Sequence, residues 1–249
     1  MKPHIKILIL NWNGKQLLKP CLGSVTSIDY PNYSIIVIDN GSSDGSIQMI
    51  KENYPNVDCL ALDKNYGFAG AYNHYFAQLT DDTTEFILLL NNDTEVDIKI
   101  LNSFIQAKEQ FGDNQIYGGK IYYHDNPEKI WYAGGNIKLK HAIISHRGIR
   151  EQDSQKFSIP MKIDYVTGCC LFTSKKVINQ LNGFDGRFYM YGEDVDLCLR
   201  AKKTGIKCYY WPKAKLWHHV SASLGGNYSI KKLSKKMMGL GRLLIKHYN

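Results

Sequence analysis

The sequence predicts an α/β domain built on a mainly parallel sheet that is flanked by helices. Four short runs of apolar, β-branched residues recur along the first hundred residues, and segments with an approximately helical period separate them. Runs this continuous are typical of strands that helices cover on both faces. With 249 residues, of which 44% are hydrophobic, the chain is long enough to bury one large core.

The first half shows a β–α–β alternation. The apolar runs comprise residues 5–10, 34–39, 58–63 and 85–90. Between them, residues 46–54 and 70–79 carry apolar side chains at helical spacing. This alternation predicts parallel strands joined by crossover helices.

The pattern changes after residue 115. Residues 134–153 are rich in Gly, His and Lys, and predict loops or a hairpin. Without an internal repeat or a Pro/Ser-rich linker, residues 1–228 are expected to form one domain, followed by a basic amphipathic helix at 229–249. The remaining predicted strands are 116–123, 164–174, 207–212 and 214–220, and the remaining predicted helices are 175–181 and one starting at Glu193.

Composition limits the class of protein. The net charge of +8 favours an anionic partner, namely nucleic acid, a phosphate-bearing substrate or a membrane surface, but no nucleic-acid module is recognisable. Six cysteines without a CxxC pair predict free, buried thiols in a reducing, cytoplasmic compartment. No apolar run approaches the ~20 residues of a membrane span, and we expect no signal peptide because the N-terminus runs directly into a strand.

Polar loops follow all four predicted strands of the first half. They are residues 11–13, 39–46, 63–70 and 91–93. Ligands of open parallel sheets bind beyond these strand ends, although loops use Asn, Asp, Gly and Ser in any case. That second explanation is weakest for Asp39 and Asp93, because each directly follows a buried strand.

The common nucleotide-binding signatures are missing. Neither GxGxxG nor GxxxxGK[ST] occurs, so a nucleotide has to be held differently. Asp39 is suited to accept the N3–H of a pyrimidine. Asp93 is suited to bind a divalent cation whose remaining ligands are phosphates and waters.

Seven motifs carry a resemblance to a known family. They are ILNWNG, YPNYSIIVIDNGSSDGS, NYGFAGAYN, LLLNNDTEVD, VTGCCLF, GFDGRFYMYGEDVDLCLRAKKTG and WHHVSASLG. In this order, from Ile5 to Gly225, they resemble the family 2 glycosyltransferases, in particular the rhamnosyltransferase-like branch that builds bacterial surface polysaccharides. The resemblance implies a GT-A fold, with a nucleotide-sugar half (1–115) and an acceptor half (116–228). It also implies a dTDP- or UDP-sugar donor, Mg²⁺ or Mn²⁺, and inversion at the anomeric carbon.

The resemblance also implies roles for residues. Asp194 matches the catalytic base, with Glu193 beside it, and Asp93 and His218 match the cation ligands, with His219 the less favoured neighbour. Asn91 stands where many members have the first aspartate of DxD. The implied donor-binding residues are Asn11, Asn13, Asp39, Gly41, Asp44, Asn65, Gly67, Asn73 and Asn92.

Plainer explanations remain open at three places. Acidic residues in a first helical turn favour the helix dipole, and Asp196 with Arg200 fits an ordinary i,i+4 pair. Aromatic residues near the site, chiefly Trp131 and Tyr191 with Tyr132 and Tyr189, are either an acceptor platform or core. The basic tail is a helix packed on the domain, a homodimer contact or a peripheral helix at the inner face of the cell membrane.

The expected activity is transfer of a sugar, such as rhamnose, to a glycan or lipid-linked glycan for the cell wall or surface. An acceptor hydroxyl needs a carboxylate to take its proton as it attacks. One alternative is a sugar-phosphate nucleotidyltransferase, which favours a basic, Gly-rich N-terminal loop where this chain has one glycine and one lysine. The other is a non-catalytic sugar-nucleotide-binding module.

Overall fold

The computed structural model describes residues 2–80, 83–220 and 230–248, with only the backbone at 230–232. The predicted boundary at residues 228/229 and the end of the WHHVSASLG motif lie outside the described residues. The strands are β1 (His4–Asn11), β2 (Tyr33–Asp39), β3 (Val57–Ala61), β4 (Thr84–Asn91), β5 (Thr94–Val96), β6 (Ile116–Tyr123), β7 (Asn126–Tyr132), β8 (Gly135–Lys138), β9 (Ile143–His146), β10 (Met161–Ile163), β11 (Cys170–Ser174) and β12 (Cys208–His218). The helices are α1 (Lys15–Val25), α2 (Ser46–Asn53), α3 (Gly67–Phe76), α4 (Ile100–Phe111), α5 (Lys175–Gln180), α6 (Glu193–Lys203) and α7 (Ile230–His247).

One sheet organises the molecule, with strand order β10-β12-β6-β11-β4-β1-β2-β3. The first four strands pair in parallel, and β6 and β12 are also parallel to one another. β11 is antiparallel to both β4 and β6, and it joins the two parallel halves. The α/β fold with a central, mostly parallel sheet is therefore confirmed.

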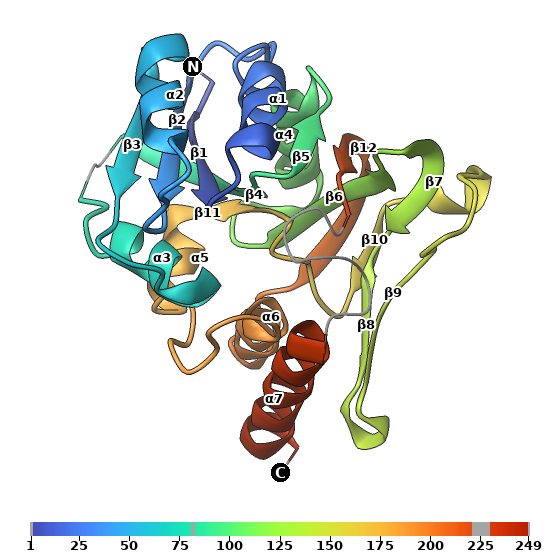
Figure 1. Ribbon diagram of the computed structural model, residues 1–249. Coiled ribbons are helices and arrows are strands. Elements are labelled where there is room, and N and C mark those ends of the chain that lie inside the picture. The colour runs from blue at the N-terminus through green and yellow to red at the C-terminus, as the bar shows by residue number, and fades with distance from the viewer. Residues whose placement is uncertain (1, 81–82, 221–229, 249) are drawn as a thin grey trace.

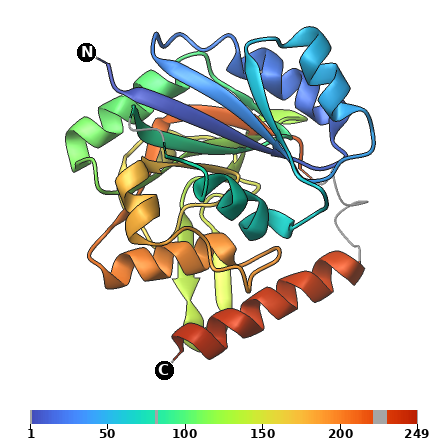
Figure 2. The ribbon, with the colours of Figure 1, turned by 90° about the vertical axis from the view of Figure 1, so that its left-hand side faces the viewer.

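Helices cover both faces of the sheet. α1, α2 and α4 lie on one side, and α3, α5 and α6 lie on the other (Figure 1). Turned by 90°, the structure shows α7 as the outermost element, below α6 (Figure 2). This double cover explains why residues 87–90 of β4 are fully buried on both faces, and why their sequence is continuously apolar.

Aromatic stacking extends the core across the antiparallel strand. The ring of Phe172 on β11 stacks on Phe86 of β4 at 5.3 Å between centroids, and on Phe104 of α4 at 4.9 Å. Such pairs contribute about 0.5–1.5 kcal/mol beyond the area that they bury. They fix α4 over the junction of the two halves.

β12 contains a bulge that the sequence analysis split into two strands. Trp211 pairs with Gly119 of β6 and Lys215 pairs with Lys120, so three residues of β12 have no partner on β6. Pro212 lies in this interval and cannot donate a ladder hydrogen bond. The bulge approaches Gly119 closely, since a Cβ there would lie 2.5 Å from the carbonyl oxygen of Ala214.

The excursion between β6 and β11 contains the predicted hairpin. β8 and β9 form a separate two-stranded sheet that projects on the side of α6 and α7 (Figures 1 and 2). A buried ion pair ties this excursion to the domain. The ammonium of Lys120, a residue only 2% exposed, lies 2.8 Å from both carboxylate oxygens of Asp153, and the Tyr122 hydroxyl donates to Asp153 Oδ2.

The C-terminal helix packs on the domain. Lys246 and His247 of α7 reach the fully buried carboxylate of Asp196 on α6 at 2.6 and 2.7 Å, and Lys246 also contacts Asp185. Gly239 lets the helix approach the loop before α6, since a Cβ there would lie 2.1 Å from the carbonyl oxygen of Tyr191. None of the described helices combines the length and apolarity that crossing a bilayer requires.

All six cysteines are free, as predicted, and five of them are buried while Cys59 is half-buried. Burial raises the pKa of five of the thiols, those of Cys21, Cys59, Cys169, Cys170 and Cys198; for Cys170 it reaches about 12. These thiols therefore stay protonated and serve as small apolar side chains.

Candidate functional site

The loops after β1 and β2 are joined at the edge of the sheet. Asn11 and Asp39 are fully buried, and the Asn11 amide donates to Asp39 Oδ2 at 2.9 Å. The other oxygen of Asp39 accepts the N–H of Ser42 at 2.9 Å. Asn92, from the loop after β4, donates to Asn11 Oδ1 at 2.6 Å. Residues from three strand ends thus form one polar network.

Two further predicted donor residues shape the rim of this network. Asn13 has a positive φ of 47° and accepts the N–H of Ser43 at 2.8 Å. Asp44 accepts the N–H of Lys15 at 2.8 Å. Burial alone would raise the pKa of Asp44, but its hydrogen bonds lower the pKa below the ordinary value. The carboxylate stays ionised and holds the start of α1.

The loop before α3 packs against the loop after β2. Gly41 has a φ of 76°, and a Cβ there would lie 2.7 Å from backbone atoms of Lys64. The amide of Asn40 donates to Asn65 Oδ1 and to Gly67 O, both at 3.1 Å. Asn65 Oδ1 in turn accepts the N–H of Gly67 at 2.8 Å. Asn40, which the sequence analysis did not single out, organises this loop.

Asn73 lies one helix turn deeper than the other predicted donor residues. Its amide group donates to Phe184 O at 2.8 Å, and its oxygen accepts the N–H of Phe184 at 2.9 Å. Asn73 therefore joins α3 to the segment that leads into α6. In this structure its side chain holds the backbone of the segment that leads into α6.

Asp93 and His218 face one another. Asp93 Oδ1 lies 3.1 Å from His218 Nε2, and the two residues are 5% and 7% exposed. Neither Asp93 Oδ1 nor His218 Nδ1 has a hydrogen-bond partner among the residues that the structure describes. Asp93 Oδ1 and His218 Nε2, a carboxylate oxygen and an imidazole nitrogen that face one another, are atom types that suit a shared cation.

Asp194 is held at the start of α6. Its Oδ2 accepts the N–H of Gly168 at 3.0 Å, and its Oδ1 accepts the N–H of Val195 at 2.8 Å. Burial raises the pKa of Asp194 above the ordinary aspartate value, although these hydrogen bonds oppose the shift. For Glu193, burial and the charge of Asp194 raise the pKa well above the ordinary value, and its Oε2 has no partner among the described residues.

The segment 167–170 connects Asp93 and His218, the two predicted cation ligands, with the Asp194 carboxylate. Gly168 donates to Asp194, and Cys169 O accepts the N–H of Asn91, two residues before Asp93. The charges of Asp93 and Asp194 both raise the pKa of the buried Cys169 thiol, after the larger effect of burial. Both carboxylates therefore lie near the same buried residue, Cys169, directly before β11.

A row of aromatic side chains in mutual contact extends from His218. The ring of Trp131 lies edge-on to His218, with 4.5 Å between centroids, and edge-on to His146 at 4.5 Å. Behind it, His146 contacts Tyr132, and Tyr132 contacts Tyr165. Burial lowers the pKa of His146 to about 4, so this imidazole is neutral at physiological pH.

The four aromatic residues proposed as an acceptor platform lie in different surroundings. Trp131 is half-buried beside His218, while Tyr132 is fully buried core. Tyr189 lies over the start of α3, where its hydroxyl donates to Asn65 at 2.9 Å, and Tyr191 lies under α7. Trp131 is the one of the four that contacts a predicted cation ligand in this structure.

Asp196 has the structural role expected of it. It accepts Arg200 Nε at 2.8 Å, as the i,i+4 pair predicts, and it also anchors α7. His219 turns away from Asp93 and contacts Glu95 at 2.9 Å. Glu95, His124 and His146 were not predicted as site residues, because only the pairing of distant strands brings them near the site.

The mostly parallel central sheet with helices on both faces is the arrangement of a GT-A glycosyltransferase fold. A family model described as "Glycosyl transferase family 2" matches residues 6–181, well over half of the chain, and the chain belongs to this family. A second model, described as "N-terminal domain of galactosyltransferase", matches residues 150–223.

Curated relatives sharpen the comparison. The chain is 28% identical to the N-acetylglucosaminyl-diphospho-decaprenol L-rhamnosyltransferase of Mycobacterium tuberculosis, over 90% of this chain and 79% of that protein. It is 26% identical to the rhamnosyltransferase WbbL of Escherichia coli, over 86% of this chain and 83% of that protein. The predicted family and its rhamnosyltransferase-like branch are confirmed.

Solved structures agree on the fold. GalNAc-T7, solved with UDP, GalNAc and Mn²⁺, superposes with a TM-score of 0.74 at 13% identity, over 98% of this chain and 48% of that chain. The mannosyltransferase PcManGT of Pyrobaculum calidifontis, solved with GDP-Man and Mn²⁺, superposes with a TM-score of 0.63 at 15% identity, over 90% of this chain and 59% of that chain. The chain thus spans about half the length of each structural relative.

Proposed function

We propose that this glycosyltransferase moves a rhamnosyl group, with inversion, from a dTDP- or UDP-sugar to a lipid-linked glycan of a bacterial cell surface. Two relatives over most of the chain are rhamnosyltransferases, and the name of one specifies a diphospho-decaprenol acceptor. The family match favours transfer over nucleotidyl transfer or binding alone. The observation that carries the mechanism is the arrangement of Asp93 and Asp194 around the turn at Cys169.

Asp194 serves as the catalytic base in this proposal. The acceptor hydroxyl oxygen forms a bond to the anomeric carbon while the bond to the diphosphate oxygen breaks. The hydroxyl proton passes to the Asp194 carboxylate, and the nucleoside diphosphate leaves with the bonding electron pair. Two backbone N–H groups fix the orientation of the carboxylate, and burial raises its pKa, which makes it a stronger base than an exposed aspartate.

Asp93 and His218 would hold a divalent cation, Mg²⁺ or Mn²⁺. Bound there, the cation supplies Lewis-acid stabilisation of the charge that develops on the leaving diphosphate. Asp39 and Asn11 would recognise the pyrimidine, because each carboxylate oxygen has a second lone pair beyond the hydrogen bond that it accepts here. Trp131, beside His218, would pack on the acceptor sugar.

The test combines a donor screen with one substitution. Melting temperatures are measured with dTDP-, UDP- and GDP-sugars, with and without Mg²⁺ or Mn²⁺, and the stabilising donor is used in transfer assays. Asp194→Asn is expected to lower the turnover by about 10²–10⁴-fold while donor binding changes little. Asp113→Asn, on an exposed pair with Lys108, is the matched control. Near-normal turnover of the Asp194→Asn protein would refute the assignment of the base.

We further propose that α7 binds the surface of an anionic membrane, where a lipid-linked acceptor resides. Its outer side exposes Leu233, Met237, Met238 and Ile245 at 53–82%. Beside them lies a hollow of about 430 Å³ lined by Arg187, Phe188, Arg242, Ile245 and Lys246.

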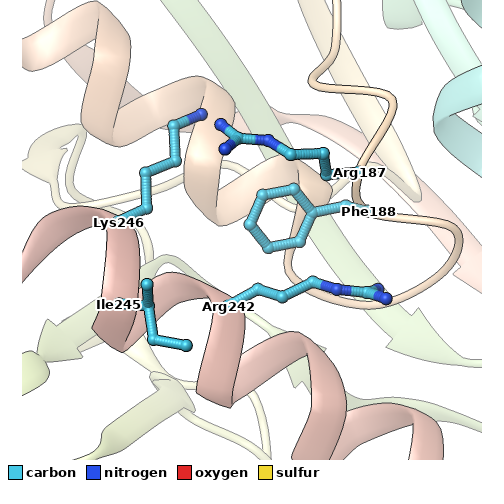
Figure 3. Close-up of a pocket in the computed structure, with 5 residues that line it drawn as sticks. All are labelled: Arg187, Phe188, Arg242, Ile245 and Lys246. Carbon is cyan, nitrogen blue, oxygen red and sulfur yellow. The ribbon is translucent and has the colours of Figure 1, made fainter.

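Basic side chains surround this hollow, and two of them, Arg187 and Lys246, are also paired with the Asp185 carboxylate at 2.6 Å. Figure 3 shows the cationic ends of Arg187 and Lys246 on one side of the Phe188 ring and Arg242 on the other. Basic residues around an apolar strip are the pattern of helices that lie in a membrane surface. Lys231, Lys232, Lys235 and Lys236 of the basic tail would also meet the headgroups. The side chains of the first two lie outside the described residues, and the ammonium groups of Lys235 and Lys236 lie 5.3 and 5.6 Å from the ring centroids of Tyr189 and Tyr191.

Vesicle sedimentation tests this contact. The protein is expected to sediment with vesicles that contain phosphatidylglycerol and to stay in the supernatant with vesicles of pure phosphatidylcholine. Replacing Met237 and Ile245 by glutamate should weaken binding about tenfold or more, because both side chains lose their burial in lipid. Ile98→Glu, at a residue 50% exposed outside α7, is the control. Equal binding by all three proteins would remove the proposal.

A further inference from the structure

Three further side chains of the types that bind metals lie close to Asp93 and His218. Glu95 of β5, His124 after β6 and His219 after β12 each bring one ligand atom into the same small cluster. Glu95 Oε1 lies 2.9 Å from His219 Nε2 and 3.1 Å from His124 Nε2. All three ligand atoms lie within 4.8 Å of one another.

These separations match those of ligands around one ion. Ligands bound to zinc at about 2.0–2.2 Å lie about 3–3.5 Å apart in tetrahedral or octahedral geometry. The imidazole rings are stacked, with 3.5 Å between centroids and 23° between planes, so one ring has to turn before both Nε2 lone pairs point at one ion. The other nitrogen of His124, Nδ1, lies 3.4 Å from Asp125 Oδ1, the kind of carboxylate contact that orients a metal-binding histidine.

The pleat of the sheet separates this group from the donor site. Glu95 pairs with Trp217, and Trp217 pairs with Tyr122, so these residues share one face. His219 and His124 follow by two residues on the same face, and the stacked rings of Tyr122 and Trp217 precede them. His218 lies on the opposite face with Asp93.

We propose that Glu95, His124 and His219 form a Zn²⁺ site that is distinct from the predicted cation site at Asp93 and His218. Two imidazoles and one carboxylate favour zinc over Mg²⁺ or Mn²⁺, which prefer oxygen ligands. Side-chain exposures of 20–38% leave room for water to complete the coordination.

The ion would join three strand ends next to the donor site. It would connect β5, β6 and β12, which the chain brings together from three separate segments. The N–H of His219 donates to Asp93 O at 2.8 Å, so the same backbone carries ligands for both ions. The site thus stabilises the main chain that positions Asp93 and His218.

The test measures zinc binding without a nucleotide sugar, so its result is independent of the transfer reaction. Untagged, chelator-stripped protein is titrated with Zn²⁺ against a chromophoric chelator, and Co²⁺ is used to record visible absorption. We expect one equivalent of Zn²⁺ per chain, no displacement by an about thousandfold excess of Mg²⁺, and the same binding by Asp93→Ala. His124→Ala and Glu95→Gln should each weaken binding by about tenfold or more.

His141→Ala, at an exposed histidine elsewhere, is the matched control and should bind as the parent does. Circular dichroism of each variant separates loss of the site from loss of the fold, and the isosteric Glu95→Gln protects the test if His124→Ala unfolds. No zinc bound by the parent, or zinc binding unchanged in both ligand variants, would overturn the proposal. Binding that is lost in Asp93→Ala would also overturn it, because the ion would then belong to the donor site.

Discussion

Replacing Asp196 by asparagine should detach α7 and destabilise the domain. The carboxylate is fully buried and accepts Arg200 Nε at 2.8 Å, Lys246 Nζ at 2.6 Å and His247 Nε2 at 2.7 Å. An asparagine removes the charge and turns an N–H₂ group toward these cations. Removing one partner of a buried ion pair costs about 3–5 kcal/mol. Because Lys246 keeps Asp185 as a second partner, we expect about 3 kcal/mol.

Urea unfolding followed by two probes measures this change. Asp113→Asn, at a side chain 62% exposed, should cost less than about 1 kcal/mol and is the control. Limited proteolysis within α7 should accelerate only in the Asp196→Asn protein. Equal, small changes in both variants would refute the argument, since they would mean that water already screens the buried cluster.

The pH dependence gives an independent check. Burial alone would raise the pKa of Asp196, but hydrogen bonds from Lys246, Arg200 and His247 outweigh burial and lower the pKa. For a carboxyl whose folded pKa is lowered, the stabilisation is present above the unfolded pKa of about 3.9 and is lost as the pH falls through the folded pKa. The difference between the parent and the Asp196→Asn protein should therefore shrink below about pH 4.

Three further predictions concern the site. Glu193→Gln should raise the melting temperature at neutral pH by about 2 °C or more, because burial and the charge of Asp194 raise the pKa of Glu193 and make its ionised form costly; a lower melting temperature would contradict this. Gly67→Ala should cost about 1–3 kcal/mol and weaken donor binding in calorimetry, because φ is 73° and the new Cβ would lie 2.3 Å from Tyr189 O; unchanged binding would show that the loop adapts. Turnover should rise with pH through a midpoint above about 3.9, since burial raises the pKa of Asp194; a midpoint below that value would exclude Asp194 as the titrating base.

The strands of the first half could be predicted because a strand that is buried on both faces has a continuous run of apolar residues. The predicted strand at 85–90 lies within β4, whose residues 86–90 are nearly inaccessible. Helix α1 was not predicted, since Pro20 and Gly23 interrupt its pattern and the surrounding packing outweighs their cost. The antiparallel direction of β11 depends on pairing with β4 and β6, which single-strand composition does not record.

The same distinction applies to the site. The loops at the strand ends were predicted because all parallel strands bring their ends to one edge. That Gly168 holds Asp194, and that Trp131 packs on His218, depends on contacts between segments 26 and 87 residues apart. The pair of Asp196 with Arg200 could be predicted from helical spacing, whereas its contact with Lys246 depends on α7 and the contact of His219 with Glu95 depends on β5.

The bulge in β12 has a consequence for the order of the two adjacent histidines. Side chains alternate along a strand, so the three unpaired residues after Trp211 reverse which face each later position presents relative to β6. With this register, His218 lies beside Asp93 and His219 lies beside Glu95. Gly119 provides the space beneath Ala214 O that the bulge needs. A glycine on the neighbouring strand therefore helps to decide which of the two imidazoles lies beside Asp93.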